Sequence, residues 1–569
     1  MKKLFDRQRR DLTAAGLALL VILACAARLV LAAQGRLYLE PENSPIDDQL
    51  MYNAAVSITN GQWLGPYAYN TIAKHMFFSV WLAFVHWLGA PYLLANAALA
   101  LAGAWVMASA LAPVLKKRLW VLAAFVMLAF CPVGFDRYNA RIYRDSITVS
   151  LLLLAFGGMI GAVLRAMPAE KEAHPRRRCA ARWGYAVIGG LGLGTSWLNR
   201  EDGVWLLPFC VCFAVLGAVL VVKAQGLRRS TSALASFCLP FVLLAGCLVA
   251  YAGMNNAYYG RFLISDLTSR DFTTAYGLLT GIEDENTGAC RPITRATRQV
   301  LYDNSDFFAA LEPYWESPVV LGGYGSKDAG EYGGSFYYGM RLANQLAGQY
   351  RDAAETKAFY EEMAAELRRL EAQGVIRITH FHATTVPYWR GEYLLPTLKE
   401  LGSELKMALF LPTFEPRTPI SVYSRQELVD EMRQYLHGDI VRGYQEGTDL
   451  PYFNPKAYAL EQALCWLWRC FAAVGTAAGL WLAFARFRQG FAALFGRRRP
   501  VELPEVCRWV LVCGLGLSAL MRCALMSYME VTVFHIGTYL MYLSTASPLF
   551  GLAGLLGLQA LLQARTARR

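Results

Sequence analysis

Residues 44–52 read SPIDDQLMY, a short polar stretch that separates two long apolar regions. Ser44 is the expected N-cap of a helix, Pro45 its first residue and Asp47 the acid of a capping box. One apolar face of this helix would consist of Ile46, Leu50, Ala54 and Ile58. The stretch therefore predicts a short amphipathic helix with Asp47 and Asp48 on its first turn. Two interpretations are open: the acids only complement the helix dipole, or they belong to a functional site.

The composition is that of a membrane protein. The 569 residues are 55% hydrophobic and 17% charged, with apolar runs longer than a soluble globule carries. The 13 cysteines fall almost entirely in those runs, so neither a disulfide framework nor a zinc site is predicted. The polar segment 254–455 has 27 Asp and Glu against 19 Lys and Arg, a net charge of −8, so the rest of the chain carries +20 and the whole chain +12. That excess indicates membrane topology and not a nucleic-acid partner.

Ten apolar runs are expected to cross the membrane. They are residues 12–33, 91–115, 119–135, 147–164, 184–198, 204–222, 234–252, 459–485, 507–526 and about 538–562. The run 75–88 is too short to cross and is predicted to be an interfacial or re-entrant helix. Most loop Lys and Arg residues then share the side of both chain ends, which the positive-inside rule assigns to the cytoplasm.

The predicted fold class is a polytopic α-helical membrane protein with an inserted extracytoplasmic α or α+β domain. The membrane module covers 1–253, the polar domain 254–455 and the C-terminal membrane helices 456–569. The polar domain is expected to be folded, because a capping box at 424–427 opens one helix and 354–373 forms another. The apolar face of the second helix would hold Phe359, Met363, Leu367 and Leu370.

This topology brings the charges of every short outer loop to one face of the membrane. Ionisable groups at the edge of a bilayer are costly to leave unpaired and tend to mark a working site. The candidates are Asp47, Asp48, Lys74, Arg137, Arg141, Arg144, Asp145, Arg200, Glu201, Asp202, Glu530 and His535.

Three of these arginines, Arg137, Arg141 and Arg144, follow a helical spacing. If the loop is helical, the three arginines share a face, where their like charges repel unless an anion lies between them. The planar guanidinium group suits a phosphate in that position. The alternative is that Arg141 pairs with Asp145 while the other two reach lipid headgroups. Arg200 and Glu201 could equally form a mutual salt bridge at a helix end.

The remaining polar motifs carry weaker signals. His380 and His382 would lie on one side of a strand, but no carboxylate or cysteine at ligand spacing accompanies them, so no metal site is predicted. Tyr388-Trp389-Arg390 is either a sugar-stacking surface or an aromatic packing cluster. The sequence has no P-loop and no GxSxG elbow, which argues against nucleotide-driven and serine-hydrolase chemistry.

The order of these parts resembles the GT-C superfamily of membrane glycosyltransferases, such as protein O-mannosyltransferases and lipid A aminoarabinose transferases. The resemblance rests on the Asp47-Asp48 pair followed by Tyr52, on Gly61-Gln62-Trp63 and on Lys74. More closely, the chain is similar to a poorly characterised bacterial family with matching stretches at 47–74, 141–144 and 200–208. The resemblance covers nearly the whole membrane part and implies no function for 254–455.

The resemblance implies transfer of a sugar from a polyprenyl-phosphate carrier to an extracytoplasmic glycan, lipid or protein, with inversion at the anomeric carbon. Asp47 or Asp48 would take the proton of the acceptor hydroxyl, and Lys74 with the arginines would hold the departing phosphate. A divalent cation bridging acid and phosphate is compatible with it. The implied location is the bacterial cytoplasmic membrane, within the lipid bilayer, with the large domain and active site outside.

Two other classes of function stay open at this point. One is a transporter or flippase for a lipid-linked saccharide, although no pair of repeated halves is visible. The other is a non-catalytic scaffold whose polar domain binds an envelope partner.

Overall fold

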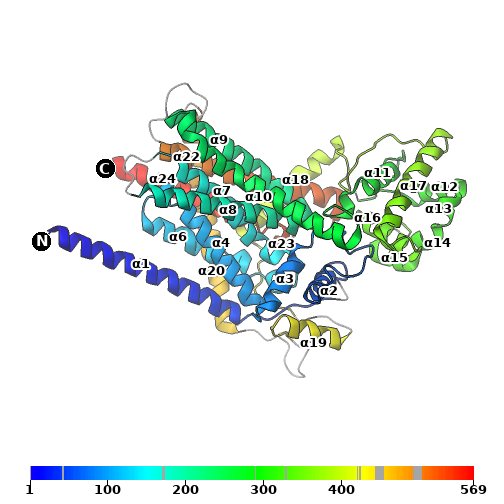
Figure 1. Cartoon of the computed structure of the whole chain (residues 1–569), viewed down its shortest axis with the longest axis horizontal. Helices are drawn as coiled ribbons and strands as arrows, with labels where there is room; N and C mark the ends of the chain where they lie inside the picture. Colours follow the sequence, from blue (N-terminus) through cyan, green and yellow to red (C-terminus); the bar gives the residue numbers. More distant parts are fainter. Residues whose placement is uncertain are drawn as a thin grey trace.

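The computed structural model describes residues 2–568 except 42–43, 169–173, 289, 327, 329, 420, 422–424, 442–453, 490 and 492–502. Over this range the chain is helical, with isolated bridges such as Tyr38 to Arg141 but no strand. A bundle of long helices carries a smaller helical domain at one end (Figure 1). Both chain ends lie at the opposite end of the bundle, which is the arrangement that the predicted topology requires. Which side is cytoplasmic stays a prediction.

Eight helices in the described residues are long and apolar enough to cross a membrane, or nine if one bent pair is a single span. The eight contain α1 (Lys2–Ala33), α4 (Tyr92–Ala110), α7 (Asp145–Ala166), η3 (Glu201–Leu206) with α9 (Leu207–Gln225), α10 (Leu227–Tyr259), α20 (Pro455–Ala485), α22 (Leu503–Met529) with η6 (Glu530–Phe534), and α24 (Ala546–Arg568). The protein is therefore a polytopic helical membrane protein. The bent pair joins α6 (Arg118–Ala129) to η1 (Pro132–Gly134) and η2 (Arg137–Ala140) through an angle of 42°.

The predicted span 184–198 lies in α8 (Pro175–Asn199), which does not reach the same hydropathy. Its glycines explain why, because they replace apolar side chains at a close helix crossing. A Cβ on Gly158 of α7 would lie 2.2 Å from the Cα of Gly189 in α8. Small residues at such contacts let two membrane helices approach closely. Helix α8 is thus held in the bundle by fit and not by its average hydropathy.

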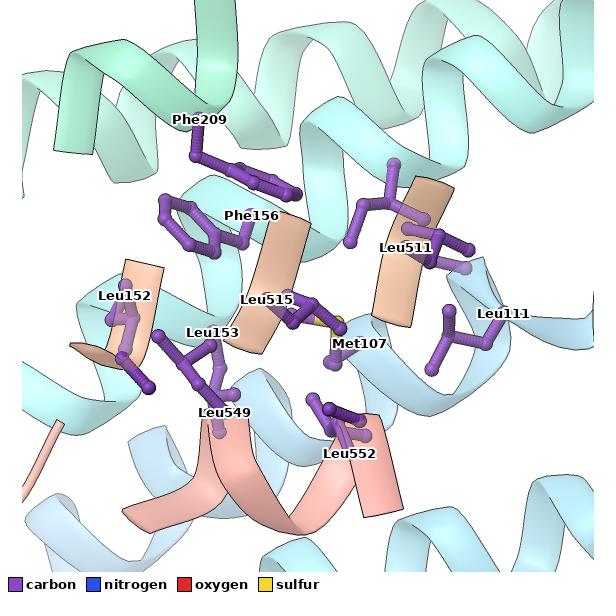
Figure 2. Packing of buried hydrophobic residues seen from close by; sticks show 14 of the residues in the cluster. Met107, Leu111, Leu152, Leu153, Phe156, Phe209, Leu511, Leu515, Leu549 and Leu552 are labelled. Carbon is purple, nitrogen blue, oxygen red and sulfur yellow. The ribbon is translucent and has the colours of Figure 1, made fainter. Parts of the chain in front are cut away.

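The bundle core is apolar and centres on α7. Met107 and Leu111 from the end of α4 meet Leu152, Leu153 and Phe156 of α7. The facing side chains come from α9, α22 and α24, and they are Phe209, Leu511, Leu515, Leu549 and Leu552 (Figure 2). This core fixes the ends of α7 and α8, from which the charged loops emerge.

Four shorter elements complete the membrane part. They are α2 (Asp48–Thr59), α3 (Phe77–Trp87), α5 (Ala112–Leu115) and α23 (Leu540–Leu543). Helix α3 has 11 residues, which is too short to cross a bilayer, as predicted for this run. The last apolar run is split, because α24 begins at Ala546 and not near residue 538.

The polar segment is divided. Residues 266–378, here called the appended domain, form their own hydrophobic core. Its elements are η4 (Asp266–Thr268), α11 (Arg270–Thr280), α12 (Arg295–Asn304), α13 (Asp306–Ala309), α14 (Glu312–Trp315), α15 (Pro318–Tyr324), α16 (Phe336–Leu346) and α17 (Ala353–Ala372). Helix α17 matches the predicted helix 354–373, with its four predicted apolar residues buried. The described part of this domain is all-α, so the α+β alternative is wrong.

The rest of the polar segment returns to the bundle. After η5 (Gly391–Tyr393), α18 (Leu394–Phe410) packs against α22, α20 and α24, and Met407 and Ala408 join the bundle core. Helix α19 (Gln426–Tyr435) packs near α2 and α3, where the rings of Tyr435 and His86 stack at 4.0 Å. The predicted boundary at 253–254 also falls inside α10. The capping box predicted at 424–427 includes Ser424, which lies outside the described residues.

Candidate functional site

Asp48 is fixed by an arginine from a distant loop. Nε of Arg141 lies 2.7 and 2.9 Å from the two carboxylate oxygens, and Nη2 of the same arginine donates to Ser44 Oγ at 2.7 Å. Asp48 is completely buried. Burial raises its pKa and Arg141 opposes that shift. The predicted capping box is therefore wrong: α2 begins at Asp48, because Ser44 is engaged by Arg141 and does not cap the helix.

Asp47 forms a different pair, with Lys74. One carboxylate oxygen accepts from the Lys74 ammonium, while the Asp47 side chain remains 27% exposed and that of Lys74 only 5%. Burial opposes ionisation of Asp47, but Lys74 and then Arg144 outweigh it, and the pKa of Asp47 falls below its usual value. Burial lowers the pKa of Lys74, although Asp47 opposes this. Of the two adjacent acids, Asp47 is the one that a substrate can reach.

Arg144 connects these pairs to the corner between α8 and η3. Its Nη1 donates to Glu201 Oε1 at 2.7 Å, and the same oxygen accepts from the backbone N–H of His75 at 2.9 Å. Arg144 also acts electrostatically on both Asp47 and Lys74. Glu201 thereby holds the chain immediately after Lys74.

Arg200 ties together the remaining acids. It donates to Asp145 and, from Nε and Nη2, to the two oxygens of Asp202 at 3.1 and 3.0 Å. Asp202 also accepts from Nη1 of Arg522 in α22 at 2.5 Å. The pairings Arg141–Asp145 and Arg200–Glu201 considered from the sequence do not form.

We call this group the charge cluster. It consists of Asp47, Asp48, Lys74, Arg141, Arg144, Asp145, Arg200, Glu201, Asp202 and Arg522. Five acids face five cations, so the cluster is neutral as a set. All of them except Arg522, which lies inside α22, are at or near the end of a helix or in a connecting loop, because apolar helix interiors exclude unpaired charge.

Aromatic rings line the charge cluster. Arg141 and Arg144 both lie over the ring of Tyr143, and Arg200 lies over Tyr542. The Lys74 ammonium is 5.5 Å from the centre of the Tyr338 ring, which α16 of the appended domain contributes. Rings at these distances attract cations through their quadrupole, the more so where water is excluded.

The appended domain also fixes the loop that carries Lys74. Arg341 donates to the carbonyl of Tyr69 at 2.8 Å, and Gln345 accepts from the Tyr69 backbone N–H at 2.8 Å. Further along the loop, the Asp266 backbone N–H donates to the Ile72 carbonyl at 2.9 Å. Lys74 is thus positioned by a domain for which the resemblance implied no function.

Four predicted site residues lie outside the charge cluster. Tyr52 packs edge-on against Tyr435 at 5.4 Å. Glu530 accepts from the Gly537 backbone N–H of its own turn at 2.6 Å, and His535 caps η6. Arg137 lies over the ring of Tyr138. The predicted three-arginine face does not form, because Arg141 is extended and separates η2 from α7.

Sequence reasoning missed Arg522 and the aromatic residues that line the charge cluster. The predicted span 507–526 contains Arg508 at its start and Arg522 further inside, and the inner arginine was a usable signal because intramembrane charges are rarely without function. Tyr338 and Tyr542 gave no such signal, because tyrosines within apolar helical segments are ordinary core residues.

A large cleft, here called the lateral cleft, lies beside the charge cluster and encloses about 1230 Å³, part of it open to solvent. Its apolar wall comes from α1, α4 and α7, and includes Leu93, Ala97 and Leu153. Arg28, Arg36 and Arg137 line it as well. Segment 139–146 separates the two features: Asn139 and Ser146 face the cleft, and Arg141, Arg144 and Asp145 belong to the cluster.

Among the described residues, no group of three or more His, Cys, Asp or Glu side chains is arranged to hold a metal ion. Comparisons with protein-family models, curated proteins and solved structures find no match to this chain.

Proposed function

We propose that this protein is an inverting glycosyltransferase that moves a sugar from a polyprenyl-phosphate carrier to an acceptor at the outer face of the membrane. One observation carries the proposal: a cleft with one apolar wall and a set of buried cations lie on opposite sides of the single segment 139–146. A lipid phosphate needs both parts, an apolar channel for the chain and cations for the head.

Asp47 is the proposed base. Both oxygens of Asp48 are occupied by Arg141 in a fully buried position, so Asp48 holds Arg141 in place and does not take the proton. Asp47 keeps partial exposure and lends only one oxygen to Lys74. In the reaction, the oxygen of the acceptor hydroxyl bonds to the anomeric carbon of the donor sugar while Asp47 accepts the hydroxyl proton. The bond between the anomeric carbon and the phosphate oxygen breaks, and both of its electrons leave with the phosphate.

The pairing of Lys74 with Asp47 suits this step. When Asp47 takes the proton it becomes neutral, and the buried Lys74 ammonium loses its counter-charge. The leaving phosphate gains negative charge in the same step. Lys74 therefore exchanges the Asp47 carboxylate for the leaving phosphate as its counter-charge. Arg144, which acts electrostatically on Asp47 and Lys74, lies close enough to stabilise that phosphate as well.

A non-catalytic scaffold is the alternative that one observation favours. Every cation of the cluster is already paired with an acid, as a purely structural network would be. The two functions differ in what the loss of one acid does. A scaffold loses stability, whereas a transferase loses turnover.

The test is release of polyprenyl phosphate from a polyprenyl-phosphate sugar by the purified protein, with and without candidate acceptors. We expect Asp47→Asn to abolish release while the protein stays folded and loses only a small part of its thermal stability. Glu361→Gln, which removes an exposed acid of the appended domain, is the matched control and keeps full activity. Equal release by Asp47→Asn and the control would exclude Asp47 from the chemistry. Absence of release by the unaltered protein with every donor would remove the proposal.

A further inference from the structure

A second pocket lies between the appended domain and the chain that follows it, with a volume of about 480 Å³ that includes space open to solvent. Its walls come from the end of α11, the loop after it, the segment 382–393, Gly334 and Thr532. It shares no residue with the charge cluster or the lateral cleft.

Two glycines beside this pocket allow one of its walls to form. A Cβ on Gly277 would lie 2.2 Å from the carbonyl oxygen of His382, and one on Gly281 would lie 2.3 Å from that of His380. The segment carrying both histidines can therefore lie directly on α11. The predicted strand does not form there; instead both imidazoles pack on the ring of Tyr388, at 4.5 and 5.8 Å.

The charged side chains that line this pocket are all positive. Arg291 and Arg390 are its cations, and no described residue that lines it is a carboxylate. Each arginine pairs with an acid outside the pocket, Arg291 with Asp328 and Arg390 with Glu392, whose side chains are 64% and 63% exposed. Pairs this exposed contribute little, so a ligand anion can replace them at small cost.

The other lining groups suit a hydroxyl-rich ligand. Four threonines and three tyrosines supply hydroxyls. The rings of Tyr388 and Tyr393 offer apolar faces of the kind that sugar rings pack on, and Nδ1 of His382 is buried without a hydrogen-bond partner among the described residues. Arginine side chains beside such rings bind carboxylate or phosphate groups in a fixed orientation.

The pocket also adjoins the charge cluster. Tyr276 lines it, and the ring of Tyr276 meets that of Tyr337 edge-on at 6.3 Å. On the cluster side, Glu201, Arg144 and Asp47 all act electrostatically on Tyr337. One aromatic pair therefore separates the two sites.

We propose that this pocket binds an acidic saccharide, one that carries a uronate or phosphate group. The binding itself is independent of the transfer reaction. The further assignment of this saccharide as the acceptor rests on the proposed function.

The test is isothermal titration of the full-length protein with two tetrasaccharides of equal length, the acidic tetragalacturonate and the neutral maltotetraose. We expect only the first to bind, and we expect Arg390→Gln and Arg291→Gln each to weaken it about ten- to a hundredfold, as loss of a charged hydrogen bond does. Arg377→Gln is the control, because this exposed arginine pairs with Glu283 outside the pocket. Hydrogen exchange of α11 in each variant checks that the wall remains folded.

Three results would overturn the proposal: equal binding of maltotetraose, unchanged binding in both pocket variants, or equal binding of a tetraglutamate peptide of the same charge. Asp47→Asn is the arm that separates the two proposals. It must keep full tetragalacturonate binding even though it loses release of polyprenyl phosphate. No tetragalacturonate binding by the unaltered protein, with its release of polyprenyl phosphate intact, would leave the transferase standing and remove the saccharide pocket.

Discussion

Two buried ionic networks in this protein are built differently. In the appended domain, Arg341 is fully buried and reaches Asp266, itself 2% exposed, at 3.3 Å, with the ring of Tyr350 alongside. In the charge cluster, Asp47 keeps partial exposure and its partner Lys74 comes from a separate loop. A network closed to solvent can only hold structure. A network with one acid open to solvent can also exchange a proton or a partner, and this difference is the physical basis for assigning chemistry to the second.

The largest effect is expected in the closed network. Arg341→Leu leaves Asp266 buried without this partner and releases the carbonyl of Tyr69, so the appended domain should lose about 3–5 kcal/mol. Hydrogen exchange of α11 and α17 measures this local free energy of opening. Arg351→Leu, which removes an exposed arginine of the same domain, is the control and should change it by less than about 1 kcal/mol. A small effect of Arg341→Leu would show that burial does not distinguish the networks.

The next effect is on turnover. Lys74→Gln removes the cation that we assign to the leaving phosphate, so release of polyprenyl phosphate should fall about 10²- to 10³-fold, with KM changed much less. Lys357→Gln, on the exposed face of α17, should be neutral. A Lys74→Gln enzyme with normal kcat would contradict the partner exchange proposed for Lys74.

The Asp48–Arg141 pair should couple by about 0.5–3 kcal/mol in a double-mutant cycle. Asp48→Asn and Arg141→Gln each leave one buried partner alone, whereas the double variant leaves neither, so the single losses of stability should not add. Thermal unfolding of the four proteins gives the coupling energy. Simple additivity would indicate that solvent already screens the pair.

The smallest effect is on pH dependence. The pKa of Asp47 lies below its usual value, so Asp47 stays ionised as pH falls to about 4, the ordinary value for Asp. Its contribution to stability is present above that pH and is lost only as pH falls through the lowered pKa. The acid limb of kcat/KM that belongs to Asp47 should therefore lie below about pH 4. A limb near pH 6 that disappears in Asp47→Asn would contradict this sign.

Much of this organisation was predictable from the sequence. Apolar runs located the spans, and the loops between them identified nine of the ten members of the charge cluster. The ion-pair partners within the cluster were not predictable. Asp48 pairs with Arg141, and not with Lys74, which is nearer in the sequence, because α2 packs against distant loops. Ser44 failed as a cap for the same reason: its hydroxyl has a tertiary partner that no local pattern encodes.

The polar segment misled in another way. Helix α18 carries enough Lys and Glu to read as part of a soluble domain, yet its Met407 and Ala408 pack into the bundle core. Helix α8 was predicted as a span at 184–198 and lies in the bundle, although glycines lower its hydropathy where they allow contact with α7. In both helices the fit of one face against the bundle matters more than the average composition.

The most direct measurement is an experimental structure of the full chain with polyprenyl phosphate bound. The account predicts the lipid chain in the lateral cleft, the phosphate within hydrogen-bond distance of the Lys74 ammonium, and the Lys74–Asp47 contact broken. A phosphate bound elsewhere, with Lys74 still on Asp47, would contradict it.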